Sequence, residues 1–366
     1  MDQREPETAR LIRKGLPALK NPFLVTMREK NSFSIGETLT PIGTAFYIVP
    51  FINAMTRSGT LEEQWLLFES MLDWKGYAEI PSQKRGCKGQ MDLRVNEAVR
   101  VATNVKKRQT DVQDESLEYI KKLIAAQGLD QNKVMIIASE ARPIEKNVAG
   151  LIANKLASEY QRPAMVLNKY KREDGEYWQG SARGYERFPI KDFKDFVANS
   201  NLSSLAQGHQ GAFGIGFPAD NLEKFIEYTN NYFSTIDCSP KYDVDFIYQA
   251  NNFKSSSILQ LGDAGHIWGQ NLREPLIAIE QIKVTKDNMT LMSRDRNPTL
   301  KITLPNGVEI IKFKSSEEEF ESLYSETGCV TINVVGTCAV NRYYYNVTPQ
   351  IKVTEYEIID KQDYYF

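Results

Sequence analysis

The segment from residue 133 to residue 167 constrains the fold of this chain most. It holds a short apolar run, KVMIIAS (Lys133–Ser139), an amphipathic stretch (Glu145–Tyr160) and a second apolar run, PAMVL (Pro163–Leu167). Short apolar runs bounded by polar residues are typical of buried strands, and a helix between two strands allows the strands to lie parallel. The segment therefore predicts a βαβ unit at the centre of an α/β domain.

Later segments extend this α/β domain. We expect further strands at Tyr177–Arg183 and Ala212–Phe217, followed by a closing helix at Leu222–Phe233. The fold class predicted for this part of the chain is α/β, with a mixed sheet.

A glycine-rich stretch, SSLAQGHQGAFGIGF (Ser203–Phe217), lies inside this domain and contains one of the two histidines of the chain, His209. Glycine permits tight bends and the close approach of another group. The imidazole can therefore project into open space and donate a hydrogen bond to a phosphate or a base. Alternatively, His209 is a turn residue that satisfies a nearby carbonyl. These residues alone do not decide between the two interpretations.

The N-terminal part has the pattern of helices. Two short helices are expected first, the second starting at Asn21-Pro22. The apolar run Ala45–Ile52 is either a helix or a strand, because Pro50 limits both. Thr60 and Glu63 then have the spacing of a capping box. The inner side of the helix that they begin is expected to carry five apolar side chains, those of Trp65, Leu66, Phe68, Met71 and Leu72.

A long polar helix is expected next, between Met91 and Ile124, as one helix or two, with its end at Gly128. Its apolar positions are sparse. A helix of this kind more often connects domains than lies inside one, so the main domain boundary is predicted here.

From about residue 243 the pattern changes to all-β. Five short β-type segments recur, at Leu276–Val284, Thr299–Leu304, Val308–Phe313, Val330–Val340 and Gln350–Ile359. They predict a small Greek-key barrel, of which the OB fold is one type. Tyr343, Tyr344 and Tyr345 lie in one of its expected loops. There they either stack on bases or cover the mouth of the barrel.

Composition narrows the class of protein. A chain of 366 residues is expected to form two or three domains. No apolar run is long enough to cross a bilayer, and the charged N-terminus has no signal-peptide core. The four scattered cysteines indicate neither a disulfide framework nor a zinc site. We therefore expect a cytoplasmic protein with no membrane partner.

The net charge of −2 conceals a gradient along the chain. Residues 80–110 contain eight Lys and Arg against two Asp and Glu, and residues 142–194 contain eleven against seven. Residues 310–366 contain five against nine. A basic middle with an acidic tail suits a polyanion groove. For any single cluster, however, lysines displayed to water are the simpler interpretation.

Several motifs, taken in order, resemble the RecJ family of single-strand-specific DNA exonucleases, within the DHH phosphoesterase superfamily. PFINAMTRSG (Pro50–Gly59), QGSARG (Gln179–Gly184) and AQGHQGAFG (Ala206–Gly214) are similar to three motifs of that family. GQNLREP (Gly269–Pro275), Asn341 and PQIKV (Pro349–Val353) are similar to parts of its OB domain. The resemblance covers nearly the whole chain.

The resemblance implies four parts. Residues 1–89 would be a helical remnant adjoining a DHH domain, and residues 90–128 a connecting helix. Residues 129–236 would be the DHH-associated α/β domain, and residues 237–366 an OB-fold-like β-barrel.

The resemblance also implies nucleic-acid-binding roles for six residues, which are Asn53, Arg57, Ser181, Arg183, Gly208 and His209. A guanidinium binds phosphate oxygens with fixed geometry, a hydroxyl adds a short hydrogen bond, and glycines expose backbone amides. Without the resemblance, an ion pair at a domain junction would be favoured for Arg57 and a surface charge at a strand end for Arg183. Three positions depart from the family motifs, with Gln207 in place of a glycine, Phe213 in place of an alanine and Gly184 in place of a serine.

The catalytic domain of the family is not found in this sequence. There is no DHH signature, and the histidines are His209 and His266. Two-metal hydrolysis needs a cluster of metal ligands, so no catalytic residue, metal or other cofactor is predicted in this chain. Mn²⁺ or Mg²⁺ is implied only for the missing DHH domain.

We therefore expect the single-stranded-DNA-binding half of a RecJ-like 5′–3′ exonuclease. Its expected partners are single-stranded nucleic acid, DNA in particular, and a separate DHH-domain chain. The alternative is a non-catalytic scaffold derived from the same fold, and whether the chain alone is an enzyme stays open.

Overall fold

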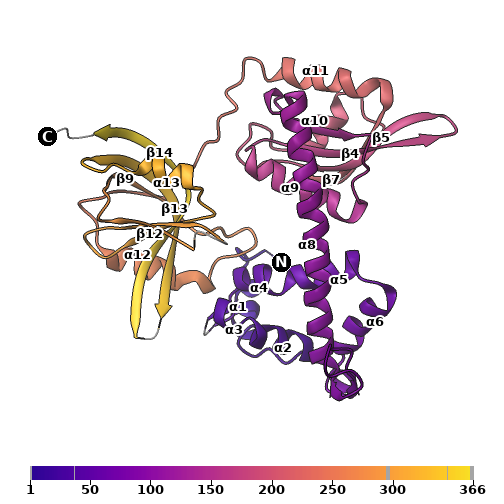
Figure 1. Cartoon of the computed structure of the whole chain (residues 1–366), viewed down its shortest axis with the longest axis horizontal. Helices are drawn as coiled ribbons and strands as arrows, with labels where there is room; N and C mark the ends of the chain where they lie inside the picture. The colour runs from indigo at the N-terminus through magenta and orange to yellow at the C-terminus, as the bar shows by residue number, and fades with distance from the viewer. Residues whose placement is uncertain (1, 37, 294–296, 344, 363–366) are drawn as a thin grey trace. The chain divides into compact units, whose positions relative to one another are not determined.

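The computed structural model describes residues 2–36, 38–293, 297–343 and 345–362. The chain forms two compact units, each described by itself below (Figure 1). Unit 1 comprises Met1–Val49 and Tyr242–Phe366, and unit 2 comprises Pro50–Lys241. Within the described residues, no helix combines the length and the apolar character needed to cross a bilayer.

Unit 2 begins with helices whose ends follow from the sequence. The apolar run around Pro50 is helical, and Pro50 lies in the first turn of α5 (Val49–Ser58), where its missing N–H costs nothing. Helix α6 (Leu61–Ser70) starts at the expected capping box between Thr60 and Glu63. Helix α7 (Asp73–Gly76) and a hairpin of β1 (Glu79–Pro81) and β2 (Met91–Leu93) follow.

The inner side expected for α6 is wrong in part. Leu67 is the buried apolar side chain of α6, with 4% of its surface exposed, whereas Trp65 and Phe68 are 58% and 52% exposed. Both stripes of the helix are apolar, so the helical spacing alone could not select the buried one.

Helix α8 (Arg94–Gln127) is a single helix of 34 residues that ends at Gly128, in the left-handed conformation. Leu117, Ile120 and Ile124, in its second half, pack against the sheet domain of unit 2, while its first half packs against α6. The short 3₁₀ helix η1 (Leu129–Gln131) leads from it into the sheet.

The sheet of unit 2 has five strands in the order β3-β4-β5-β7-β6. As predicted, β3 (Met135–Ser139) and β4 (Ala164–Arg172) are parallel and are joined by α9 (Lys146–Glu159). The other pairs are antiparallel. They involve β5 (Gly175–Arg183), β6 (Leu205–His209) and β7 (Ala212–Pro218).

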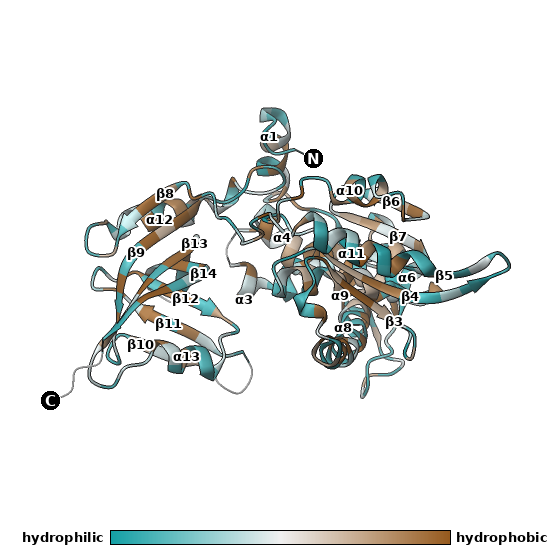
Figure 2. Ribbon diagram, turned by 90° about the horizontal axis from the view of Figure 1, so that it is seen from above, coloured by the Kyte–Doolittle hydropathy of each residue, from teal (hydrophilic) through white to brown (hydrophobic). Residues whose placement is uncertain are grey.

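Two hydrophobic layers enclose this sheet. Small side chains at Ala149, Ala153 and Ala157 let α9 pack closely on β4 and β5, together with α8. The opposite face packs against α10 (Phe193–Asn199) and α11 (Leu222–Tyr232), which follows the 3₁₀ turn η2 (Ala219–Asn221). Figure 2 shows hydrophobic strands between these helices and a hydrophilic end of the β4–β5 hairpin.

The N-terminal segment of unit 1 contains the two expected helices and two further ones. Asn21 caps the second, with its side-chain oxygen accepting from the Leu24 amide at 3.2 Å. The four helices are α1 (Pro6–Gly15), α2 (Pro22–Lys30), α3 (Ser32–Ile35) and α4 (Pro41–Tyr47).

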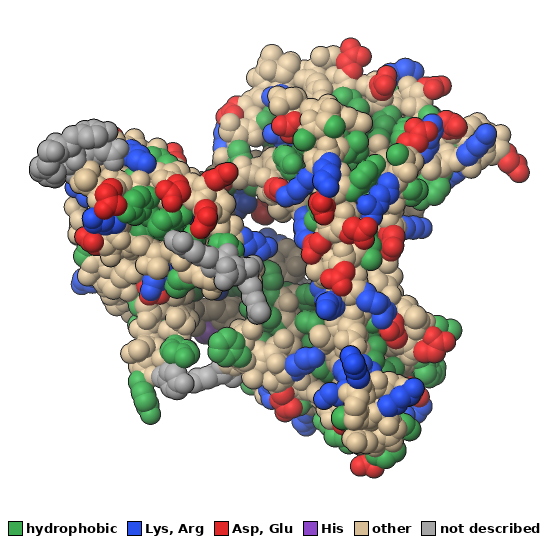
Figure 3. Space-filling view, in the orientation of Figure 1, with side chains coloured by type: hydrophobic (Ala, Val, Ile, Leu, Met, Phe, Trp, Pro, Cys, Tyr) green, Lys and Arg blue, Asp and Glu red, His purple; other side chains and the backbone are tan. Residues whose placement is uncertain are grey.

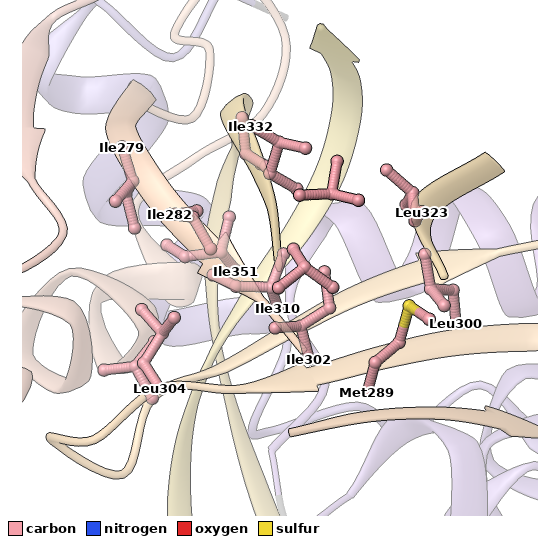
Figure 4. Close-up of a cluster of buried hydrophobic side chains, with 14 of the residues drawn as sticks. Ile279, Ile282, Met289, Leu300, Ile302, Leu304, Ile310, Leu323, Ile332 and Ile351 are labelled. Carbon is pink, nitrogen blue, oxygen red and sulfur yellow. The ribbon is translucent and has the colours of Figure 1, made fainter. Parts of the chain in front are cut away.

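The C-terminal segment of unit 1 forms a mixed seven-stranded sheet in the order β10-β11-β12-β14-β13-β9-β8. Its strands are β8 (Phe246–Gln249), β9 (Leu276–Val284), β10 (Met289–Met292), β11 (Thr299–Thr303), β12 (Glu309–Phe313), β13 (Cys329–Tyr343) and β14 (Asn346–Gln362). Its helices are α12 (Ser255–Asp263), η3 (Ala264–His266) and α13 (Glu317–Leu323). Isoleucine and leucine side chains from these strands and α13 form its core (Figure 4).

All five strands expected in this region are present, but the described residues show no closed barrel. The hydrogen-bonded order ends at β10 on one side and at β8 on the other. Tyr343 and Tyr345 are exposed at the end of the long β13–β14 hairpin, and Tyr344 lies outside the described residues.

Candidate nucleic-acid interface

Strand register in unit 2 places several of the expected binding residues on one face of the sheet. Arg183 pairs with Ala212, which pairs with His209, so these three residues form one row across β5, β7 and β6. Ser181, Gly214 and Gln207 form a second row two residues along. Directly paired residues project to the same side of a sheet, and so do residues two apart in a strand. Arg183, Ser181, Gln207 and His209 therefore share one face.

The floor between these polar residues is made of small ones. On this face β7 contributes Ala212, Gly214 and Gly216, followed by Pro218 at its end, while α9 packs on β4 and β5. A Cβ added to Gly214 would meet only the Gln207 carbonyl oxygen, at 3.7 Å. Two strand spacings separate Arg183 from His209, which is about 10 Å. The register thus leaves a row of small residues, called the shelf below, between an arginine and a histidine.

Arg183 is half-buried against helix α9. An added Cβ on Gly150 would overlap the Arg183 Nη2 atom and would lie 3.2 Å from its Cζ and 3.5 Å from the Ser181 Oγ. The guanidinium thus occupies the space that a larger residue at position 150 would fill. Its Nη1 donates to the carbonyl of Ala182 at 2.7 Å.

Arg57 is brought close to this group from the end of α5. Its neighbour Ser58 accepts hydrogen bonds from Gln109 of α8 at 3.0 Å and from Asn147 of α9 at 3.1 Å. These bonds tie the end of α5 to the helix that supports Arg183.

Burial, and after it the positive charge of Arg57, lowers the pKa of the Arg183 guanidinium from its ordinary value. Among the described residues neither arginine forms a salt bridge to a carboxylate. The ion pair considered for Arg57 from sequence is therefore not observed, and Arg183 is not a plain surface charge. Two neighbouring cations without an acidic partner are an arrangement that a bound anion would stabilise.

Gly208 and His209 lie on β6, the edge strand, so His209 is not the turn residue that was considered as the alternative from sequence. Gly208 has a φ of +139°, and an added Cβ would lie 2.8 Å from the Ala212 carbonyl oxygen, so glycine is required here. His209 is exposed, and its imidazole forms no hydrogen bond to a carbonyl within the described part of the chain.

Asn53 lies one turn before Arg57 on α5 and is exposed. No side-chain bond joins it to Arg183 or Ser181 in the described chain, so its place in the interface follows only from sharing a helix face with Arg57.

Three residues that contribute to this interface were not found from sequence, namely Ser58, Asn147 and Gly150. Gly150 had a detectable signal, because a glycine inside a helical pattern lowers helix propensity and often has a packing reason. Asn147 and Ser58 had none, since polar residues at these positions are also typical of solvated helix ends.

The described residues do not fit a catalytic metal. They contain no group of three or more His, Cys, Asp or Glu side chains placed to hold an ion.

Several known proteins are similar to this chain in sequence or in structure. No protein-family model matches the chain. The chain is 32% identical over 360 residues to YorK of the SPbeta prophage in Bacillus subtilis strain 168, a protein named as a single-strand DNA-specific exonuclease. The match covers 98% of this chain and 62% of YorK. Over 256 residues the chain is 22% identical to the single-stranded-DNA-specific exonuclease RecJ of the same organism, covering 68% of this chain and 30% of RecJ.

The crystal structure of RecJ from Thermus thermophilus in complex with Mn²⁺ has the same fold over 96% of this chain, with a TM-score of 0.64 and 17% sequence identity. It aligns to 47% of that RecJ chain. The chain thus spans less than two thirds of the length of the relatives it matches.

Proposed function

The chain is homologous to the RecJ-like single-strand DNA-specific exonucleases along 98% of its length, and on this premise we propose that it is the strand-binding part of such an enzyme. It binds single-stranded DNA through the face of the unit 2 sheet that carries Arg183 and His209. Phosphodiester hydrolysis is carried out by a DHH-type domain on another chain, which supplies Mn²⁺ or Mg²⁺ and the residues that hold it.

The observation that supports this proposal most is the arginine pair. Arg57 and Arg183 are close enough for one charge to lower the pKa of the other, and the described residues give neither a carboxylate partner. A phosphate bound between them would replace repulsion with two charge-assisted hydrogen bonds. Such contacts recognise the backbone of the strand and not its sequence.

The remaining residues of the face have complementary roles in this proposal. Ser181 adds a hydroxyl beside Arg183, and His209 provides a donor for the next phosphate or base along the shelf. Gln207, one of the positions that depart from the family motif, projects from the same face as His209 and can donate or accept. The absence of a side chain on Gly214, where an added Cβ would meet only the Gln207 carbonyl oxygen, leaves room for the strand.

We also propose the finer assignment of the unit 1 sheet as an OB-type fold. Three features support it, namely the parallel pairing of β12 with β14, the position of α13 between β12 and β13, and the antiparallel pairing of β13 with both β14 and β9. In OB folds the loop between the last two strands contacts nucleic acid, which corresponds here to the hairpin end with Tyr343 and Tyr345.

A titration of the full chain with fluorescent single-stranded oligothymidine at 50 and 200 mM salt tests strand binding. We expect binding that weakens steeply with salt, because each phosphate contact to a single strand contributes about 0.7 to the slope of log K against log salt. No binding, or binding insensitive to salt, would contradict the proposal and favour a non-catalytic scaffold.

The hydrolytic part of the proposal needs a second assay. The chain is mixed with its candidate DHH partner, Mn²⁺ and 5′-labelled single-stranded DNA. We expect more degradation than the partner produces alone, and equal degradation would rule out the split enzyme.

A further inference from the structure

The loop between β1 and β2 carries an unpaired basic cluster outside the candidate interface. Residues Ser82–Gln90 read SQKRGCKGQ and contain Lys84, Arg85 and Lys88 but no acidic residue. All three side chains are exposed, and within the described chain none forms an ion pair. Lys and Arg side chains gather around this end of α8 in Figure 3.

This basic loop has a regular internal structure. Two turns follow one another, closed by hydrogen bonds from Cys87 N to Lys84 O and from Gln90 N to Cys87 O, each 3.0 Å long. Each turn has a basic residue in its second position and a glycine in its third, where Gly86 and Gly89 have φ values of +82° and +84°. A positive φ in the third position of a turn is the reason for glycine there. Arg85 and Lys88 thus occupy equivalent positions in the two turns.

A buried carboxylate holds the base of the basic loop. Glu97 of α8 is 3% exposed and accepts from the Gln83 amide at 3.1 Å and from the Ser82 hydroxyl at 3.3 Å. It also pairs with Arg100, and the hydrogen bond from Arg100 is the largest cause of its lowered pKa. An ionised, fully bonded carboxylate at this point fixes the loop on the helix, so its cations are presented in a defined arrangement.

We propose that the basic loop is a second contact for the phosphate backbone of the same single strand that binds at Arg57 and Arg183. This inference rests on the proposed function and extends its footprint. Both sites belong to unit 2. Glu97 of α8 lies at the loop, and Gln109 of the same helix donates to Ser58, the neighbour of Arg57. The two α8 residues are twelve positions apart, which corresponds to a rise of about 18 Å along the helix.

The surroundings favour an extended polyanion over a small anion or an acidic protein. The cations stand near one another on an exposed hairpin loop, where a ligand that extends along the surface can contact several of them. Between Ala98 and Gln109, α8 contains four basic residues and no acidic one. Two of them, Arg100 and Arg108, are paired with glutamates, whereas Lys107 is exposed. Lys107, which forms no ion pair among the described residues, therefore adds one cation between the loop and the arginine pair.

The test compares two triple variants of the full chain with the same net charge. In the loop variant Lys84, Arg85 and Lys88 are replaced by glutamine. In the control variant Lys121, Lys171 and Lys224, which are exposed elsewhere in unit 2, are replaced by glutamine. Binding to oligothymidines from about 4 to about 16 nucleotides, the range of single-strand site sizes, is measured at several salt concentrations.

We expect the loop variant to bind the longest oligonucleotide more weakly, with the salt slope reduced by about 2 for three lost contacts. It should bind the shortest like the unmodified chain, because a short strand bound at Arg183 does not reach the loop. The control variant should bind all lengths normally.

Equal binding by the loop variant at every length, or an equal loss in the control variant, would overturn this inference. If Arg183→Ala weakens binding in the same series, the proposed function stands and only the second contact is lost. If the unmodified chain binds no oligothymidine, both proposals fail together. The same variants are also titrated with poly-glutamate. If the loop variant loses binding to poly-glutamate but keeps its DNA binding, the loop recognises an acidic protein, and this inference is overturned.

Discussion

Replacing Gly150 by alanine should separate strand binding from folding. The added methyl group would overlap the Nη2 atom of Arg183 and lie 3.2 Å from its Cζ, so the guanidinium must move. The overlapping atom is the far end of a flexible side chain and not backbone. The cost to folding is therefore at most the bond from the guanidinium to the Ala182 carbonyl, and a hydrogen bond of a charged group contributes about 1.5–3 kcal/mol. Part of this cost is offset, because alanine in place of glycine inside a helix stabilises the folded chain by up to about 1 kcal/mol.

The cost to binding is not offset by helix propensity. A charge-assisted hydrogen bond to a phosphate contributes about 1.5–3 kcal/mol, so misplacing Arg183 should raise the Kd for single-stranded DNA about 10- to 150-fold. The salt slope should fall by about 0.7, the value for one phosphate on a single strand. Fluorescence anisotropy at several salt concentrations measures both quantities, and urea denaturation of the same sample measures stability.

A double-mutant cycle identifies the route of the effect. If Gly150→Ala acts only by moving Arg183, it should cause no further loss in an Arg183→Ala background. Wild-type affinity and salt slope for Gly150→Ala would refute the reasoning that the placement of Arg183 determines binding. If Gly150→Ala weakens binding as much in the Arg183→Ala background as in the unmodified chain, the claim that Gly150 acts through that arginine would be refuted.

Three other outcomes are expected. Arg183→Ala should weaken binding of single-stranded DNA about 10-fold or more, and His209→Ala about 5-fold, while the melting temperature of each variant stays nearly unchanged. A matching loss of folding in both variants would indicate structural roles. Asn168→Ala should lower the free energy of unfolding by about 1–3 kcal/mol in urea titrations, because the buried Asn168 amide bonds both the N–H and the C=O of Ile144; unchanged stability would contradict this. Burial, and to a smaller extent the charge of Glu274, raises the pKa of Cys338 from 9.0 to about 12. Iodoacetamide at pH 8 should therefore modify this thiol about 1,000-fold more slowly in the folded chain than in guanidinium chloride. Equal rates would show the thiol to be accessible and unperturbed.

The sequence was most informative about elements that are defined by local patterns of residues. The βαβ unit, the capping box at Thr60 and the end of α8 at Gly128 were all predicted, because each depends on residues close in the chain. Five of the seven strands of unit 1 were likewise found within a few residues of their observed ends, whereas the short strands β8 and β10 were not predicted. Strand β6 was missed because nearly all of its residues are exposed, so no alternation marks it.

The candidate site was harder to predict because it depends on packing between distant elements. That α9 lies over β5, so that Gly150 faces Arg183, cannot be read from either segment alone. The register that aligns Arg183, Ala212 and His209 is set by pairings among three strands. The motifs indicated Arg57 and Arg183 separately, and only the structure brought their charges together.

Strand β6 has a consequence beyond binding. It forms one border of its sheet, with β7 as its partner among the described residues, so the main-chain groups along its outer side are available to a strand of another molecule. The left-handed Gly208 interrupts the regular pleat of this border. A kinked border is a poor template for edge-to-edge growth of the sheet, so the glycine beside His209 also disfavours pairing of β6 with a strand of another molecule.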